Sequence, residues 1–161
     1  MAAGIFIKIG DLQGESVDST HRGEIDVIDW HWGMSQAGSA HAGTGAGSGK
    51  VNVKDLLFTK YSDKSSPNLI KLCCSGKHFE SATLVMRKAA GSRPLEYIKV
   101  VLKDVLVAEV KMAGRSRGDR LTETVQLNFA SFTYEYVPQG ADGASTGAIP
   151  ASWNIATNSP T

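Results

Sequence analysis

The chain has 161 residues, of which 20% are charged, and its formal net charge is +1. That balance lacks the basic excess of a nucleic-acid-binding surface, so we expect no nucleic-acid partner. No apolar run approaches the roughly 18 residues of a membrane span, so we expect no membrane insertion. The chain reaches Lys8 and Asp11 too early for the apolar core of a signal peptide, so export should need none.

The first predicted elements are strands. Ile5, Ile7 and Ile9 alternate with Phe6 and Lys8, which is the period of a β-strand. From residue 24 to residue 32 the alternation has two phases, because Ile25 and Val27 share one face and the apolar residues at 28, 30 and 32 lie on the other. This change of phase indicates a β-bulge or a sharp bend near residues 27–28.

Residues 33–50 form a long connection of glycine, alanine and serine with almost no apolar bulk. A connection of this length inside a domain is usually functional or disordered. Its end, residues 43–50, resembles a phosphate-binding loop but departs from that motif. Thr44 stands where that motif needs glycine, and Val51 where it needs serine or threonine. We therefore predict an exposed loop without a nucleotide.

One short helix is predicted at about Pro67–Ser75. Ser66 followed by Pro67 fits an N-cap and a first helical residue, and Gly76 fits a left-handed C-cap. Between them, apolar residues recur at helical spacing. They are Leu69, Ile70, Leu72, Cys73 and Cys74.

The remaining segments again alternate as strands. Ala130–Ser131 marks a second change of phase, because the apolar positions before and after it have opposite parity. We predict one strand with Ile98, Val100 and Leu102 on a face, and a separate strand with four further positions on a face. Those four are Leu106, Ala108, Val110 and Met112.

Bent strands that change faces are typical of a small barrel or a tightly coiled sandwich. The predicted fold class is therefore mainly β: an antiparallel barrel of two coiled sheets with one flanking helix. We expect residues 1–161 to form a single domain, with the loop at 33–50 and a partly flexible C-terminal tail from residue 138. Trp153 and Ile155 offer a last apolar anchor in that tail.

No pattern of catalytic or metal-binding residues stands out. The four histidines are scattered over turn, strand, loop and helix end, and no cysteine or carboxylate accompanies them at ligand spacing. Cys73 and Cys74 are adjacent on one helix, where they cannot meet disulfide geometry. The one G-x-S-x-G match, residues 45–49, lacks the strand–turn–helix setting of a hydrolase. We predict no catalytic residues, no metal and no cofactor, and hence a protein that is not an enzyme.

The turn around residues 113–120 carries several arginines, including Arg115 and Arg117. Two interpretations remain equal for this turn: an anion-contacting surface, or a solvated hairpin tip.

Several fragments together resemble one protein family. "SPNLIKLCCSGKHF" followed by "ESATLVMRKA" is similar to the haemolysin-coregulated proteins, the tube subunits of bacterial type VI secretion. "FIKIGDLQGES", "HRGEIDVIDWHWGMSQ", "GSGKVNVKDLLFTKYSDKSSP", "EYIKVVLKDVLVAEV", "DRLTETVQLNFASFTYEY" and "SWNIATN" match in the same order. The resemblance covers essentially the whole chain.

The resemblance implies a ring of six copies that stack into a hollow tube. A contracting sheath would propel that tube, a spike would sit at its tip, and secreted effectors would travel in its lumen. The protein would be made in the cytoplasm and then secreted without a signal peptide. The long loop would contact the next ring through Ser35, Gly38, His41, Gly43 and Gly47. The turn with Arg115, Ser116 and Arg117 would face the lumen.

Two alternatives stay open at this point. A phage tail-tube subunit would share the architecture in another biological setting. A monomeric β-barrel that binds a small ligand in its core would explain the strand pattern, but not the long glycine-rich loop.

Overall fold

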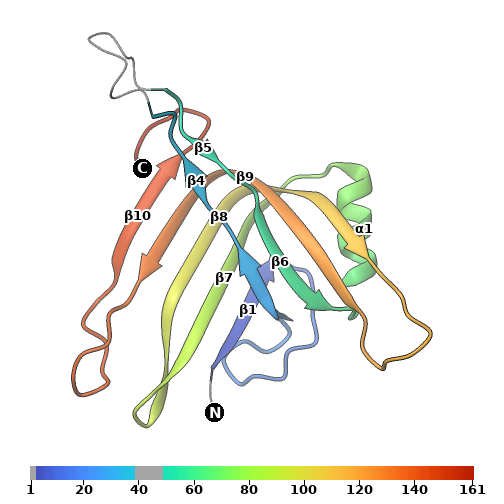
Figure 1. The fold of residues 1–161 in the computed structure, drawn as a ribbon, viewed down its shortest axis with the longest axis horizontal. Coiled ribbons are helices and arrows are strands. Elements are labelled where there is room, and N and C mark those ends of the chain that lie inside the picture. The colour runs from blue at the N-terminus through green and yellow to red at the C-terminus, as the bar shows by residue number, and fades with distance from the viewer. Residues whose placement is uncertain (1–2, 39–48) are drawn as a thin grey trace.

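A computed structural model describes residues 3–38 and 49–161, which fold into antiparallel strands with one helix on their flank (Figure 1). The elements in chain order are β1 (Gly4–Ile9), β2 (Ile25–Asp26), β3 (Asp29–His31), β4 (Met34–Ser35), β5 (Asn52–Val53), β6 (Leu56–Tyr61), α1 (Ser66–Ser75), β7 (Phe79–Ala90), β8 (Arg93–Met112), β9 (Thr122–Tyr136) and β10 (Ile149–Asn154). The predicted fold class, mainly β with one short helix, is confirmed.

One large sheet curls on itself. Its strands follow the order β2-β1-β7-β8-β9-β6-β3, with β10 added to β9, and β4 and β5 form a separate two-stranded ribbon. The first and last strands of that order, β2 and β3, are neighbours in the sequence. The N–H of Val27 donates to Ile5 O at 2.9 Å, whereas the N–H of Ile28 donates to Thr59 O at 2.8 Å. The predicted bend at residues 27–28 is confirmed, and it links the two edges of the sheet.

The prediction of two strands between residues 98 and 112 was wrong. This segment lies within the single strand β8, which pairs with β7 and β9. Asp104 has a φ of 54°, and the ladder between β8 and β9 skips it. The left-handed residue shifts the parity without breaking the strand, so Val105 and Val107 are buried instead of Leu106 and Ala108.

The second predicted phase change, in β9, is confirmed. Phe129 and Phe132 are both buried although they are three residues apart, and Ala130 is skipped in the ladder opposite Asp104. The two irregularities therefore face each other across β8 and β9, and both strands bend at one level. Trp32 packs edge-on against both phenylalanine rings, with centroid distances of 6.0 and 4.8 Å.

Apolar side chains from the strands and from α1 fill the interior of the curled sheet. Fully buried members include Ile7, Phe58, Leu69, Val100 and Leu127. Trp153 and Ile155 pack against this core, as the sequence indicated, and β10 pairs with β9 along Ile149–Asn154. No helix in residues 3–38 and 49–161 is long and apolar enough to cross a membrane.

The helix begins one residue earlier than predicted. Ser65, not Ser66, occupies the N-cap position, and its side chain makes no capping hydrogen bond. Ser66 is the first helical residue, and its hydroxyl donates a hydrogen bond to the Glu123 carboxylate inside the barrel. The C-terminal prediction is confirmed, because Gly76 has a φ of 64° and its N–H donates to Leu72 O. Leu69 is the buried apolar residue of the helix, while Leu72 and Cys73 are partly buried.

Candidate functional site

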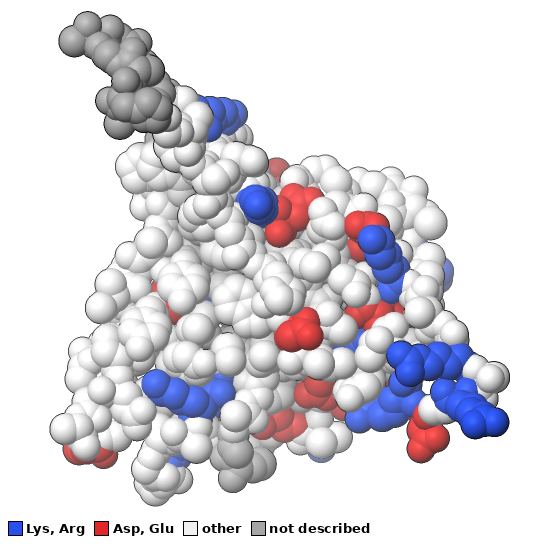
Figure 2. Space-filling view, in the orientation of Figure 1, with Lys and Arg blue, Asp and Glu red and all other residues white. Residues whose placement is uncertain are grey.

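The basic turn lies at the far end of the β8–β9 hairpin. Arg115, Ser116 and Arg117 are all exposed, and within the described residues their side chains form no ion pair or hydrogen bond. In Figure 2 basic side chains gather at the lower right, where Figure 1 places this hairpin. The arrangement leaves these guanidinium groups free to contact another molecule.

The base of the same turn is fixed. The Arg120 guanidinium lies 3.6 Å above the centroid of the Tyr61 ring, and the N–H of Ser62 donates to Leu121 O at 2.8 Å. Gly118 has a φ of 112°, which favours glycine. These contacts hold the hairpin in place, so the tip presents Arg115 and Arg117 from a supported position.

The ribbon of β4 and β5 carries the two ends of the predicted stacking loop. Met34 pairs with Val53 and Ser35 with Asn52, and the ribbon extends away from the curled sheet (Figure 1). Ser35 lies within β4, and Gly38 is exposed with open space around its Cα. The other predicted stacking residues lie outside the described residues: His41, Gly43 and Gly47.

An apolar groove separates this ribbon from β10, and the sequence analysis did not predict it. Its volume is about 300 Å³. Met34, which lines the groove, is 47% exposed, and Ile149 at the start of β10 is 60% exposed. The alternation of Val51 with Val53 was a usable signal, since it implied a short strand with one apolar face. The lining residues are Met34, Gln36, Val51, Val53, Phe132, Ala151, Ser152 and Trp153.

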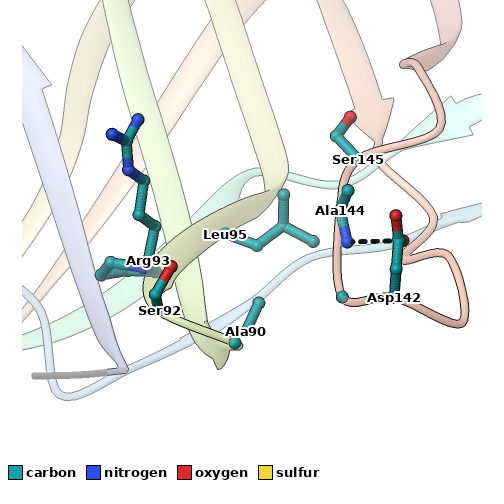
Figure 3. A pocket seen from close by; sticks show the side chains of 10 residues that line it. Ala90, Ser92, Arg93, Leu95, Asp142, Ala144 and Ser145 are labelled. Carbon is teal, nitrogen blue, oxygen red and sulfur yellow. Dashed lines mark hydrogen bonds between the residues drawn. The ribbon is translucent and has the colours of Figure 1, made fainter.

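A second hollow lies at the opposite end of β8, between two turns (Figure 3). The start of β8 contributes Arg93 and Leu95, and the turn around Asp142 closes the other side. Leu95 points toward Ala144, whereas Arg93 points away from it (Figure 3). The Asp142 carboxylate accepts the N–H of Ala144 at 3.0 Å and so folds its own turn. This use of Asp142 is structural.

A buried ionic cluster supports the start of α1 and the base of the β8–β9 hairpin. The Lys60 ammonium, which is fully buried, lies 2.7 Å from Glu123 Oε1 and 3.0 Å from Asp63 Oδ1. Ser66 Oγ accepts a hydrogen bond from Lys60 Nζ at 3.1 Å and donates to Glu123. A charged pair removed from water needs such additional hydrogen bonds to be stable. The cluster therefore fixes α1 to β6 and β9.

Comparisons with known proteins agree with this fold. The family model described as "Type VI secretion system effector, Hcp" matches residues 6–136. "Protein hcp1" of Pseudomonas aeruginosa is 56% identical over 159 residues, which is 98% of this chain and 98% of that protein.

Solved structures give the same result. The crystal structure of Hcp1 from Salmonella typhimurium is 42% identical, with a TM-score of 0.82 over 100% of both chains. A structure described as a type six secretion system protein is 29% identical, with a TM-score of 0.90 over 98% of this chain and 99% of that one. The family match covers most of the chain, and these relatives align over nearly all of it. The chain therefore belongs to the Hcp family of type VI secretion system proteins.

Proposed function

We propose that this protein is a subunit of the type VI secretion tube, with six copies in each ring and rings stacked into a hollow tube. The observation that carries the proposal is the 56% identity to "Protein hcp1" across 98% of both chains. An identity of this extent includes the surfaces as well as the core. The function would then lie in contacts between copies and not in chemistry at a single site, so we propose a structural protein and not an enzyme.

The surface of the single chain supports assembly. Among the described strands β10 pairs only with β9, which leaves its outer edge without a partner. Exposed strand edges and exposed large apolar side chains are usually covered in a soluble protein. Identical copies joined head to tail close into a ring when the rotation between them is right. Ile149, Met34 and the groove beside them supply such a surface.

The further partners follow from the same proposal. The tube would meet a contractile sheath outside and spike-tip proteins at its end, and it would carry secreted effectors within its lumen. The protein would be made in the cytoplasm and exported by the type VI apparatus itself. The packed interior of the sheet argues against a barrel that binds a small ligand in its core. The type VI family match favours the secretion tube over a phage tail tube.

The whole chain would act as one tube domain, with the segment 33–50 reserved for contacts between copies. Shortening residues 35–49 to a tight turn should leave the ring intact but weaken its stacking, because the loop is too small and polar to pack a core of its own. Electron micrographs of the purified variant should show rings and few tubes, and secretion should fall.

Glu80→Gln is the control for that variant, because it is an exposed change on β7, outside the loop. It should stack and secrete like the original protein. If the shortened protein also forms tubes and is secreted normally, the loop has no role in stacking.

A substitution of Arg115 tests whether the turn between β8 and β9 faces the lumen. Arg115→Gln should keep the ring and weaken the retention of an acidic effector, because it removes one cation from the anion-preferring tip of the β8–β9 hairpin. The measurement is the amount of effector that co-purifies with the ring. Arg93→Gln removes an exposed arginine at the other end of β8 and should retain the effector. Unchanged retention by Arg115→Gln would contradict the lumen assignment, and loss of the ring would place Arg115 at a subunit interface instead.

A further inference from the structure

Polar side chains hold the segment between β1 and β2 against the barrel. The Asp18 carboxylate accepts the N–H of Thr20 at 2.9 Å and the N–H of His21 at 3.1 Å. Both oxygens of Asp18 also accept hydrogen bonds from the Arg87 guanidinium on β7. Glu15 adds a further attachment, because its carboxylate accepts the N–H of Lys64 at 2.8 Å. Side chains thus contribute much of what holds residues 11–24 in position.

His21 lies at the centre of these contacts. It is 6% exposed, and its ring stacks on Phe6 of β1 with 4.5 Å between centroids. Its Nδ1 is 2.9 Å from Glu24 Oε2 in the same segment, and its Nε2 is 2.7 Å from Glu96 Oε1 on β8. Both ring nitrogens therefore face a carboxylate at hydrogen-bond distance.

This geometry depends on the charge of the ring. A neutral imidazole has one N–H and one lone pair, so it can donate to one carboxylate and must present a lone pair to the other. An imidazolium donates to both. Histidine is the side chain that changes its charge between about pH 5 and pH 8.

Charged side chains approach His21 from its own segment and from two neighbouring strands. Its own segment contributes Asp18 and Glu24, β7 contributes Arg87, and β8 contributes Glu96. The element β1 contributes the uncharged ring of Phe6, with the Arg87 guanidinium 4.8 Å from its centroid. The single arginine is already engaged by Asp18. Arg87 also lies opposite Glu96 in the β7–β8 ladder, but His21 is the group within hydrogen-bond distance of both glutamates.

We propose that His21, Glu24 and Glu96 form a pH-sensitive clasp for residues 11–24. With His21 protonated, the clasp bonds the segment to β8. When His21 loses its proton, one glutamate is left facing a lone pair, and the segment loosens. The clasp therefore holds the segment more firmly with the imidazolium than with the neutral ring. The clasp acts within one chain and does not require the ring.

The Asp18–Arg87 pair attaches the segment to β7 whatever the charge of His21. The hydrogen bonds from Arg87 lower the pKa of Asp18 to about 2, against the opposing effect of its burial. Asp18 therefore stays ionised at both mildly acidic and mildly basic pH. The segment should loosen around Asp18 without detaching from β7.

Amide hydrogen exchange of the intact protein, followed by mass spectrometry at about pH 5.5 and pH 8, tests the clasp. After correction for the intrinsic exchange rate, protection of the peptide spanning residues 11–24 should fall by at least about tenfold at the higher pH, the effect of losing one hydrogen bond to a charged group. The amides of Gly14, Ser16 and Gly23, which bond within the segment, should account for the change. Protection of β9 should stay constant.

Glu96→Gln provides the decisive variant. A glutamine at this position can accept from the imidazolium or donate to the neutral ring, so residues 11–24 should be equally protected at both pH values. Glu80→Gln, an exposed change on β7, should keep the pH dependence of the original protein. Equal protection of the unaltered protein at both pH values, a fall shared equally by β9, or an unchanged pH dependence in Glu96→Gln would each overturn the proposal.

Discussion

Lys60→Met should lower the free energy of unfolding by about 3–5 kcal/mol, because it leaves Glu123 charged and without a cation inside the barrel. Glu123 is 3% exposed and has the Lys60 ammonium 2.7 Å away. Urea denaturation at one fixed protomer concentration gives the measurement, since assembly adds to apparent stability.

The double variant Lys60→Met, Glu123→Gln is the control for charge. It removes both charges, and its glutamine oxygen can still accept the Ser66 hydroxyl. It should recover at least half of the stability lost in the single variant. A loss below about 1 kcal/mol in Lys60→Met would show that water reaches Glu123 and that the cluster is not buried as described.

Leu69→Ala should cost about 2–5 kcal/mol of unfolding free energy, because Leu69 is the fully buried apolar side chain through which α1 packs on the barrel. The expected result is a lower urea midpoint with an unchanged slope. Leu72→Ala is the matched control on the same helix. Leu72 is only partly buried, so this change should cost roughly 1 kcal/mol or less. Equal losses from the two variants would contradict the packing described for α1.

The bend at residues 27–28 and the helix near residue 70 could be predicted from the sequence because both depend on local signals. A change of strand parity and a glycine after an apolar helical stripe each require only neighbouring residues. The continuity of β8 could not be predicted in this way. A non-glycine residue with positive φ, Asp104, shifts the parity there, and the pairing with β7 and β9 keeps the strand whole.

In the ionic cluster, the alternation of residues along β6 predicts the buried position of Lys60 but not its partner. Leu56, Phe58 and Lys60 lie on one face of β6, and all three are buried. The same alternation that predicts a core position for Phe58 also puts Lys60 inside. The sequence alone does not name its partner, because Glu123 is 63 residues away. The Ser66 hydroxyl bonds to Glu123 and does not cap the helix, and Ser65 occupies the N-cap position.

Some of the candidate surfaces could be predicted from the sequence, and one could not. Composition alone predicted exposure for Arg115, Arg117 and the ends of the long loop. The groove beside β10 needed the fold, because β4, β5 and β10 meet there from distant parts of the chain. Contacts between copies depend on surfaces that meet only after folding.

The mass of the assembled protein in solution tests the central proposal most directly. Light scattering at micromolar concentration and moderate salt should give a particle near six times the 17.1 kDa mass of the chain. A ring of six copies would cover exposed strand edges and apolar side chains such as Ile149. A particle of 17.1 kDa under the same conditions would contradict the proposal that this protein forms the rings of a secretion tube.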